Sequence, residues 1–331
     1  MGIKCLLKFI NEFSDIIKVV DKNSLKNKRI AIDISILIYR TIISVRSSGA
    51  DFKNEEGTIT SHILGLFNKT IELLNMGIIP VYVFDGKPPS IKYKTIEERK
   101  DTRKKALEKM NHSNTDDDKI KYFKRSSQVT HEQWDQCKEL LDTMGIPYIN
   151  APEEADSQCA YLVKMGLVDS VLTEDLDILT FGSLKIIRNI TSYKIETTEI
   201  VLKDLLDKLE LTYDQFIDFC ILLGTDYNCG FIDVKPRIIY EHYKKHKNIN
   251  NTIESMKKEN IKISEDININ EIKSYFIKPN INEILSEQLK LKEPNIIKLT
   301  KILIEKYGLI KYMIKPKLDK LSDFYTNLKN Y

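Results

Sequence analysis

Three short apolar runs, far apart in the chain, lead into acidic residues. RIAID ends at Asp33, VYVFD ends at Asp85, and SVLTEDLD carries Asp175 and Asp177. A helical pattern separates the first two runs, and the order strand, helix, strand is typical of a parallel crossover unit. Because the carboxyl ends of parallel strands meet at one edge of a sheet, we expect these acids to gather in one crevice.

Strand and helix patterns alternate along most of the chain. Buried strands are expected in KRIAID, IIPVYVFDG, IPYIN and DSVLTEDLDILTFG, the last of which ends in acids. Five helices are expected. One begins near Ser35, a second spans 60–76 and stops at Gly77, and a third stops at Gly145. A fourth begins at Pro152, and a fifth ends near Gly224. The pattern predicts an α/β fold with a central, mostly parallel sheet flanked by helices, and a helical C-terminal third.

The net charge of +3 hides a strongly basic segment. Between Lys92 and Lys109 the sequence KYKTIEERKDTRKKALEK is dense in Lys and Arg, and its interleaved Glu residues favour a helix. The following NHSNTDDDK is typical of a tip between two helices, so we interpret about 90–130 as an insertion. A basic helix that borders an acidic site indicates phosphate binding, and an ordinary surface helix is the alternative.

Cysteine usage and hydropathy limit the class of protein. The five cysteines include no C-x-x-C pair, which favours reduced thiols in an intracellular protein. No apolar stretch reaches the roughly 18 residues of a membrane span, and the opening MGIKCLLKFINEFSDIIKVV lacks the pattern of a secretory signal. His242 and His246 are spaced like zinc ligands, but YEHYKKH offers no general base, so we interpret the pair as a solvated helix face.

Further acids extend the expected cluster. Glu154 and Asp156 lie in the first turn of the helix expected at Pro152, and Asp226 follows the helix that ends near Gly224. Asp175 and Asp177 are two apart on an expected strand end and therefore project from one face. On a regular helix Glu154 and Asp156 would diverge by about 200°.

A cluster of seven carboxylates requires cations, because neighbouring acids raise one another's pKa. Oxygen ligands select Mg²⁺ or Mn²⁺ over zinc. Two such ions about 4 Å apart activate water and stabilise the leaving oxygen of a phosphoryl displacement. Two alternatives stay open. The acids are ordinary caps and surface groups, or Asp175 and Asp177 form the Asp-x-Asp motif of a haloacid dehalogenase-type phosphatase, although Leu179 stands where that motif has Thr or Val.

The motifs occur in the order of a known family. MGIKCLLKFI, AIDISILIYR, NEEGTITSH, PVYVFDGKPP, MGIPY, APEEADSQCA, TEDLDILTFGS and ILLGTDY resemble those of the flap endonucleases, and the resemblance covers about residues 1–245. It implies a PIN-like nuclease core over 1–245, with a helical arch at about 90–130 and a helix-two-turn-helix at about 212–245. The region 246–331 would then be helical.

The resemblance also assigns site residues. The family's metal-binding acids fall on Asp33, Asp85, Glu154, Asp156, Asp175, Asp177 and Asp226. Lys92 and Arg99 would steer the phosphate and act with Asp177 in catalysis. DNA contacts would fall on Gly2, Tyr39, Arg46, Thr60, Arg103, Lys235 and Arg237. Tyr39 would stack on a base, with core packing as its alternative.

The duplex-binding motif departs from the family's Gly-x-Gly-Pro. Asp233 and Lys235 replace both glycines, and a Cβ there should hinder close approach of the backbone to phosphate. Lys235 and Arg237 would contact phosphate directly instead. The change predicts that the family's monovalent cation site is lost and that duplex binding is more sensitive to salt.

The C-terminal sequence LDKLSDFYTNLKNY partly fits the family's sliding-clamp motif. Leu321, Phe324 and Tyr325 match, whereas Leu318 occupies the position of Gln. The segment 318–325 is therefore either a weakened clamp-binding tail or part of a helix packed on the body.

Together these features predict an enzyme of DNA replication, repair or recombination. We expect a monomeric structure-specific 5′ flap endonuclease and 5′-3′ exonuclease that uses two Mg²⁺, with Mn²⁺ as a substitute, on branched or flapped DNA. An intracellular, nuclear location follows from the resemblance, and a cytoplasmic one stays open. The competing interpretation is a DNA-junction binding protein that has lost catalysis.

Overall fold

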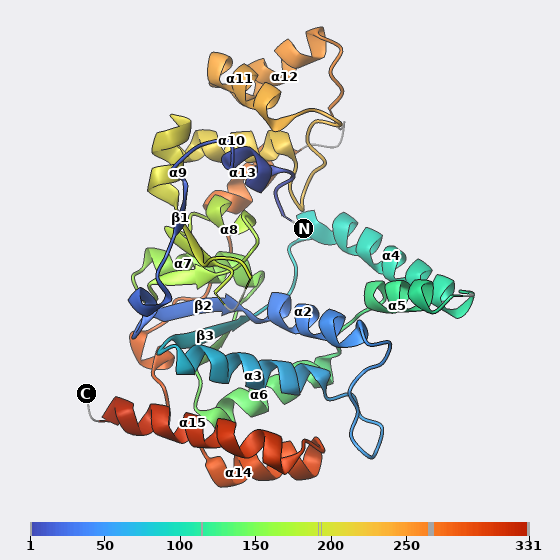
Figure 1. The fold of residues 1–331 in the computed structure, drawn as a ribbon. Helices are drawn as coiled ribbons and strands as arrows, with labels where there is room; N and C mark the ends of the chain where they lie inside the picture. Colours follow the sequence, from blue (N-terminus) through green and yellow to red (C-terminus); the bar gives the residue numbers. More distant parts are fainter. Residues whose placement is uncertain (1, 114, 191, 193, 264–267, 330–331) are drawn as a thin grey trace. The chain divides into compact units, whose positions relative to one another are not determined.

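The computed structural model describes residues 2–113, 115–190, 192, 194–263 and 268–329, drawn as a ribbon in Figure 1. The chain forms two compact units, each assembled from several segments. The first unit comprises Met1–Ser24, Asp85–Thr95 and Ala151–Glu283, and the second comprises Leu25–Phe84, Ile96–Asn150 and Ile284–Tyr331. These units do not test the predicted division into 1–245 and 246–331, which stays a prediction.

The first unit contains four short strands in the order β1-β7-β6-β5. They are β1 (Ile17–Val19), β5 (Ser170–Leu172), β6 (Lys185–Arg188) and β7 (Thr198–Val201). β5 and β6 are parallel, whereas β7 is antiparallel to both β6 and β1. The helices of this unit are α1 (Leu6–Ile10), η2 (Ser90–Lys92), α7 (Ala155–Lys164), α8 (Asp177–Thr180), α9 (Leu202–Leu209), α10 (Tyr213–Leu223), α11 (Pro236–His246), α12 (Ile249–Lys258) and α13 (Ile269–Ile277).

The second unit contains three parallel strands in the order β2-β3-β4. They are β2 (Arg29–Asp33), β3 (Ile79–Phe84) and β4 (Tyr148–Asn150). Its helices are α2 (Ile34–Arg46), α3 (Ser61–Asn75), α5 (Asp116–Arg125), α6 (His131–Met144), η3 (Ser286–Leu289), α14 (Ile296–Lys301), the π-helical η4 (Ile302–Lys306) and α15 (Lys311–Lys329). Two helical elements start in one unit and end in the other, namely η1 (Lys22–Leu25) and α4 (Tyr93–Asn111). The predicted α/β class, with mostly parallel strand pairing and flanking helices, is confirmed.

Local signals account for several element boundaries. Asp33 caps α2, because its Oδ1 accepts a hydrogen bond of 2.7 Å from the Ser35 backbone N–H. α3 and α6 are followed by Gly77 and Gly145, both with positive φ, which allows the chain to leave each helix in the left-handed conformation. These helix ends are as the sequence predicts. None of the helices in the described part of the chain has the length and apolar character needed to cross a bilayer.

The expected arch region, about 90–130, contains α4 and α5. Figure 1 shows the two helices as neighbours joined by a short connection. Within the second unit, the Lys109 ammonium lies 5.8 Å from the centre of the Tyr122 ring, so a cation–π contact links them. Apart from Ala106, the side chains of α4 and α5 are half-buried or exposed. Much of this basic helix pair therefore faces solvent.

The C-terminal helix α15 packs on α3 within the second unit. Leu321 is fully buried, and the buried Tyr325 hydroxyl donates to the backbone carbonyls of Met144 and Gly145 at 2.9 and 3.0 Å. Phe324 lines a groove of about 490 Å³ together with Leu74 at the end of α3 and Gly77 after it. The structure thus has the packed helix that the sequence left as the alternative to an exposed clamp-binding tail.

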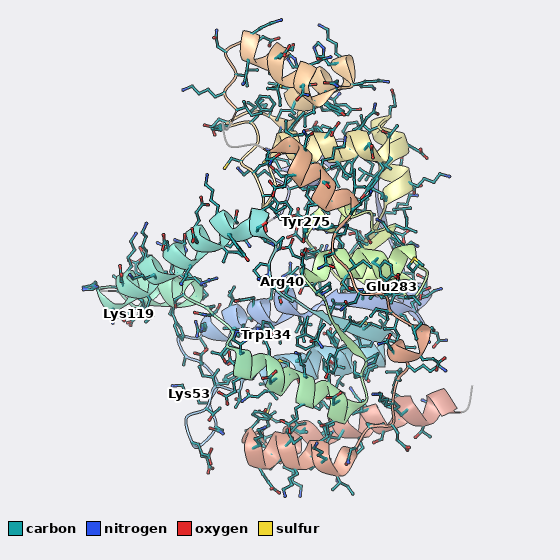
Figure 2. The ribbon with its side chains drawn as sticks, turned by 180° about the vertical axis from the view of Figure 1, so that it is seen from behind. Arg40, Lys53, Lys119, Trp134, Tyr275 and Glu283 are labelled. Carbon is teal, nitrogen blue, oxygen red and sulfur yellow. The ribbon has the colours of Figure 1, made fainter. Side chains whose placement is uncertain are left out.

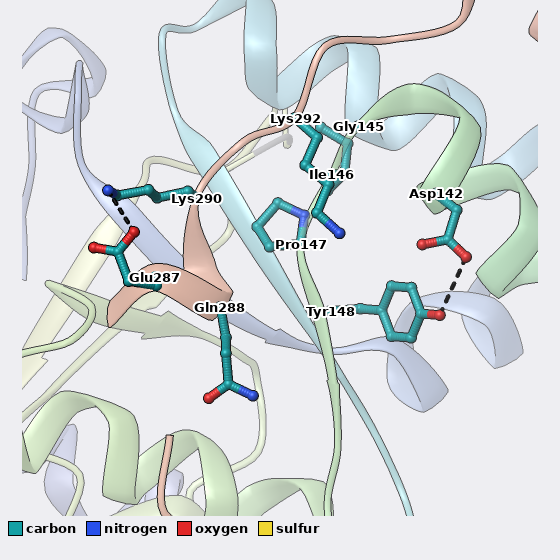
Figure 3. Close-up of a pocket in the computed structure, with 9 residues that line it drawn as sticks. All are labelled: Asp142, Gly145, Ile146, Pro147, Tyr148, Glu287, Gln288, Lys290 and Lys292. Carbon is teal, nitrogen blue, oxygen red and sulfur yellow. Dashed lines mark hydrogen bonds and ion pairs between the residues drawn. The ribbon is translucent and has the colours of Figure 1, made fainter. Parts of the chain in front are cut away.

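A second cavity of about 460 Å³ lies between the C-terminal end of α6, the start of β4 and η3 in the second unit (Figure 3). On the wall of this cavity, two pairs of polar side chains bind each other. The Tyr148 hydroxyl donates to Asp142 at 3.3 Å, and Lys290 pairs with Glu287 at 2.6 Å. These four side chains are thus engaged with one another on the cavity wall.

Candidate active site

The first unit holds most of the predicted metal-binding acids. Six of the seven lie in it, namely Asp85, Glu154, Asp156, Asp175, Asp177 and Asp226. Asp33, the seventh, lies at the end of β2 in the second unit. The second unit also contains the half-buried Tyr39, Arg99 and Arg103. The convergence of these second-unit residues with the six acids stays a prediction.

Asp175 and Asp177 lie in a turn and not on a strand end. β5 stops at Leu172, the Asp175 N–H donates to Thr173 Oγ1 at 3.0 Å, and the Asp177 N–H donates to Asp175 Oδ1 at 3.3 Å. The expectation that both acids extend from a strand is therefore wrong, because side-chain hydrogen bonds of Thr173 and Asp175 replace the strand ladder. Asp177 begins α8, and the two acids remain adjacent.

Asp177 is crowded by negative charge. Its exposed fraction is 5%, and burial raises its pKa well above the usual value, with the nearby Asp175 and Asp226 adding to the effect. The backbone N–H of Ile3 and the Lys92 ammonium act in the opposite direction. These three aspartates therefore lie close enough to repel one another, which is the setting in which a cation is stabilising.

α7 begins later than the sequence predicts. Its first residue is Ala155, and Glu154 is an extended N-cap with φ −87° and ψ 139°. The helix does not start at Pro152 because the carbonyls of Pro152 and Glu153 accept hydrogen bonds from Lys87 and Gly86. Glu154 is thus outside the regular helix, and its orientation does not follow the expected divergence of about 200° from Asp156.

The turn after β3 fits closely against this start of α7. A Cβ on Gly86 would lie 2.3 Å from the carbonyl oxygen of Ala151, so the approach requires glycine. Asp85, just before it, accepts a hydrogen bond of 2.9 Å from the Ala155 N–H. Asp85 therefore caps the same helix end that presents Glu154 and Asp156.

Lys92 lies among these acids. Its ammonium is paired with Glu154 Oε1 and is 3.5 Å from Asp226 Oδ2. Burial alone would lower the pKa of Lys92, but the carboxylates of Glu154 and Asp226 outweigh this and raise it above the usual value. The side chain therefore stays positively charged, as a phosphate-steering group must.

Two tyrosine hydroxyls bind the other oxygen of Glu154. Tyr227 donates to Glu154 Oε2, and Tyr275 donates to the same atom at 3.3 Å. Burial and the neighbouring Glu154 raise the pKa of both hydroxyls, so they remain protonated donors. Sequence analysis did not identify either residue. Tyr227 follows Asp226 directly, which is a usable signal, whereas Tyr275 is distant in sequence from every acid.

The start of the chain also contacts the acids. Gly2 has φ +89°, and a Cβ there would lie 2.0 Å from Asp175 Oδ1. Its backbone N–H points to Asp226 Oδ1 at 3.5 Å. Gly2, a predicted DNA contact, therefore lies against the carboxylates, and only glycine allows this approach.

The donor set fits a hard divalent cation. As the side chains stand, the described residues form no ready-made group of three or more His, Cys, Asp or Glu ligands. Carboxylate oxygens nevertheless surround the Lys92 ammonium and crowd Asp177. An oxygen-only set with excess negative charge suits Mg²⁺ or Mn²⁺ and not zinc.

Comparison with known proteins identifies the family. The models of the XPG N-terminal domain and the XPG I-region match residues 1–106 and 145–226. Flap endonuclease 1 of Homo sapiens is 38% identical over 310 residues, which cover 92% of this chain and 82% of the human protein. The chain belongs to the flap endonuclease family. Flap endonuclease 1 of Monosiga brevicollis is 37% identical, over 97% of this chain and 89% of that protein.

Two solved structures have a similar fold. Flap endonuclease-1 from Methanococcus jannaschii has a TM-score of 0.75 and 32% identity, covering 96% of this chain and 98% of that one. The catalytic core of Rad2 in complex with a DNA substrate has a TM-score of 0.76 and 26% identity, covering 97% of this chain and 100% of that one. The resemblance found in the sequence is confirmed, and the phosphatase alternative is wrong.

Two of the predicted DNA contacts in this flap endonuclease, Arg46 and Thr60, are bonded or buried within the second unit. The Arg46 guanidinium pairs with Asp51 at 2.9 Å, donates to the Phe123 carbonyl at 3.1 Å and lies 4.2 Å from the centre of the Phe123 ring. Arg46 therefore ties α2 to α5 within the second unit. Thr60, at the start of α3, is only 2% exposed.

The segment that matches the duplex-binding motif has a left-handed residue in place of the first glycine. Asp233 has φ +56°, a left-handed conformation that Asp tolerates better than most residues. Lys235 and Arg237 are exposed at the start of α11, with Pro236 at its first position. Arg237 pairs with Glu241 at 3.0 Å. Both basic side chains are exposed, and their contact with phosphate stays a prediction.

Proposed function

We propose that this flap endonuclease hydrolyses DNA phosphodiesters near junctions of single and double strands with two Mg²⁺ ions, for which Mn²⁺ can substitute. The observation that carries the proposal is the Lys92 ammonium held between Glu154 and Asp226 beside the crowded Asp177. A basic group and an acidic cluster at one place match a phosphate next to divalent cations.

In this proposal the chain's residues divide the work by charge. The carboxylates hold the ions, which supply a water nucleophile and stabilise the leaving oxygen when bound. Lys92, joined by Arg99 from α4, offsets the negative charge that develops on the phosphate. The DNA is contacted by Tyr39, Arg103, Lys235 and Arg237. The 5′ single strand of the DNA passes through the arch formed by α4 and α5. No covalent intermediate is involved, because water is the nucleophile.

The sliding clamp, the monovalent cation, the oligomeric state and the location in the cell are proposals that rest on the family resemblance. Binding of a sliding clamp through Leu321, Phe324 and Tyr325 would require the end of α15 to leave the body, because Leu321 and Tyr325 are buried. With Asp233 and Lys235 in place of glycine, we propose duplex binding without a monovalent cation. A monomer acting in the nucleus agrees with the family resemblance.

The test is cleavage of a 5′-labelled flap with Mg²⁺, compared with gapped and blunt duplexes at two salt concentrations. Cutting next to the flap junction, abolished by a chelator and restored by Mg²⁺ or Mn²⁺, is expected, because the acids repel one another without counter-charge. Cutting that persists in the chelator would contradict the metal requirement. Tight flap binding with no cutting at any metal concentration would favour the junction-binding interpretation.

A further inference from the structure

A part of the chain beyond both family-model matches reaches the acidic site of the first unit. α13 lies after residue 226, where the XPG I-region match ends. Its Tyr275 nevertheless donates a hydrogen bond of 3.3 Å to Glu154 Oε2. Figure 2 labels Tyr275 on this helix and Glu283 farther along the segment that follows it. The C-terminal part of the first unit therefore touches a predicted metal ligand.

The same segment makes a second, reciprocal contact with α7. Gln158, about one turn after Glu154, is fully buried. Its side-chain amide donates to the Asn282 carbonyl at 2.9 Å and accepts from the Asn282 N–H at 2.8 Å. Both polar atoms of the buried amide are thus bonded to the backbone that follows α13, which holds that backbone beside the helix that Glu154 caps.

α13 is also held by an ion pair and by aromatic packing. Lys273 pairs with Asp218 of α10 at 2.7 Å. Phe276 is fully buried, and its ring centre is 5.1 Å from that of Phe181 and 5.4 Å from that of Tyr227. Tyr275 packs on the same two rings, 5.7 Å from Phe181 and 5.4 Å from Tyr227, so one aromatic cluster holds both residues of α13.

We propose that residues 268–283 form a brace that orients Glu154 for metal binding, with Tyr275 as a positioning residue. Tyr275 and Tyr227 together engage Oε2, which leaves Oε1 directed at the place where Lys92 lies. Hydrogen bonds to a ligating carboxylate fix its orientation and raise metal affinity. This inference rests on the proposed function, because it assumes that Glu154 is a ligand.

The test is Mn²⁺ binding to the metal-free full chain, measured by the loss of the free Mn²⁺ signal in electron paramagnetic resonance. Tyr275→Phe removes the hydroxyl but keeps the ring that packs 5.7 Å from Phe181. We expect about 10-fold weaker binding of Mn²⁺ at the affected site. Flap cleavage should need more Mn²⁺, whereas its rate at saturating Mn²⁺ and its KM for DNA should stay near the wild-type values.

Tyr82→Phe is the matched control. It also removes a buried hydroxyl, and that hydroxyl bonds Thr70 at 2.9 Å within the second unit. Unchanged Mn²⁺ affinity in this variant, with a loss in Tyr275→Phe, supports the brace. Equal affinity of Tyr275→Phe and wild type overturns the brace alone. If the wild-type chain binds no Mn²⁺, both the brace and the metal site of the proposed function are wrong.

Discussion

Replacing Asp177 with Asn is expected to slow flap cleavage by about 10²–10³-fold while leaving flap binding nearly unchanged. The side chain is 5% exposed and lies among Asp175, Asp226 and the backbone N–H of Ile3. Asn keeps the shape and an oxygen acceptor but removes the charge that would hold a cation. The variant also relieves repulsion among the acids, so its unfolding temperature should not fall.

Single-turnover cleavage with Mg²⁺ and fluorescence anisotropy with Ca²⁺ separate these two effects for Asp177→Asn. Asp204→Asn is the matched control, because Asp204 lies in the same unit and pairs with Lys18 at the surface. It should cleave at the wild-type rate. Cleavage by Asp177→Asn at the wild-type rate would contradict the assignment of Asp177 to the catalytic site.

Lys92→Met is expected to produce a loss of similar size, about 10²-fold in the rate at saturating DNA. The side chain is largely buried between Glu154 and Asp226, and Met has similar length without the charge. The carboxylates would then lose a counter-charge and the phosphate a partner. Because the effect falls on the charge that develops during reaction, kcat should decrease more than KM increases.

The matched control for Lys92→Met is Lys18→Met, which removes an exposed lysine of the same unit from its pair with Asp204. Single-turnover rates at saturating flap DNA compare the two variants. Lys92→Arg should recover part of the rate, because it restores the charge but not the shape of the ammonium. A Lys92→Met enzyme that cuts as fast as the Lys18→Met control would show that Lys92 does not act on the phosphate.

Sequence patterns predicted the elements whose boundaries depend on neighbouring residues. Asp33 caps α2 through Ser35, and Gly77 and Gly145 follow the ends of their helices, all within a few residues of the boundary. Boundaries set by distant segments were wrong. Gly86 and Lys87 bind the carbonyls before Glu154 and delay α7, a contact that no local pattern encodes.

The candidate site shows the same division. The acids could be selected because each follows a recognisable strand or helix end or matches a family motif. Tyr275 could not be predicted, because its contact with Glu154 joins residues that are 121 apart in the sequence. Arg46 was assigned to DNA by the resemblance. Its guanidinium also bonds the nearby Asp51 and the carbonyl of Phe123, which is 77 residues away in the sequence and could not be predicted from a local pattern.

Crystals of the chain soaked in Mn²⁺ test the central claim most directly, because Mn²⁺ scatters anomalously and accepts the same oxygen ligands as Mg²⁺. Two anomalous peaks about 4 Å apart are expected among the carboxylates of Asp175, Asp177, Asp226 and Glu154, with Asp33 turned toward one of them. Featureless anomalous maps around these oxygens, with Lys92 still paired to Glu154 at high Mn²⁺ concentration, would contradict it.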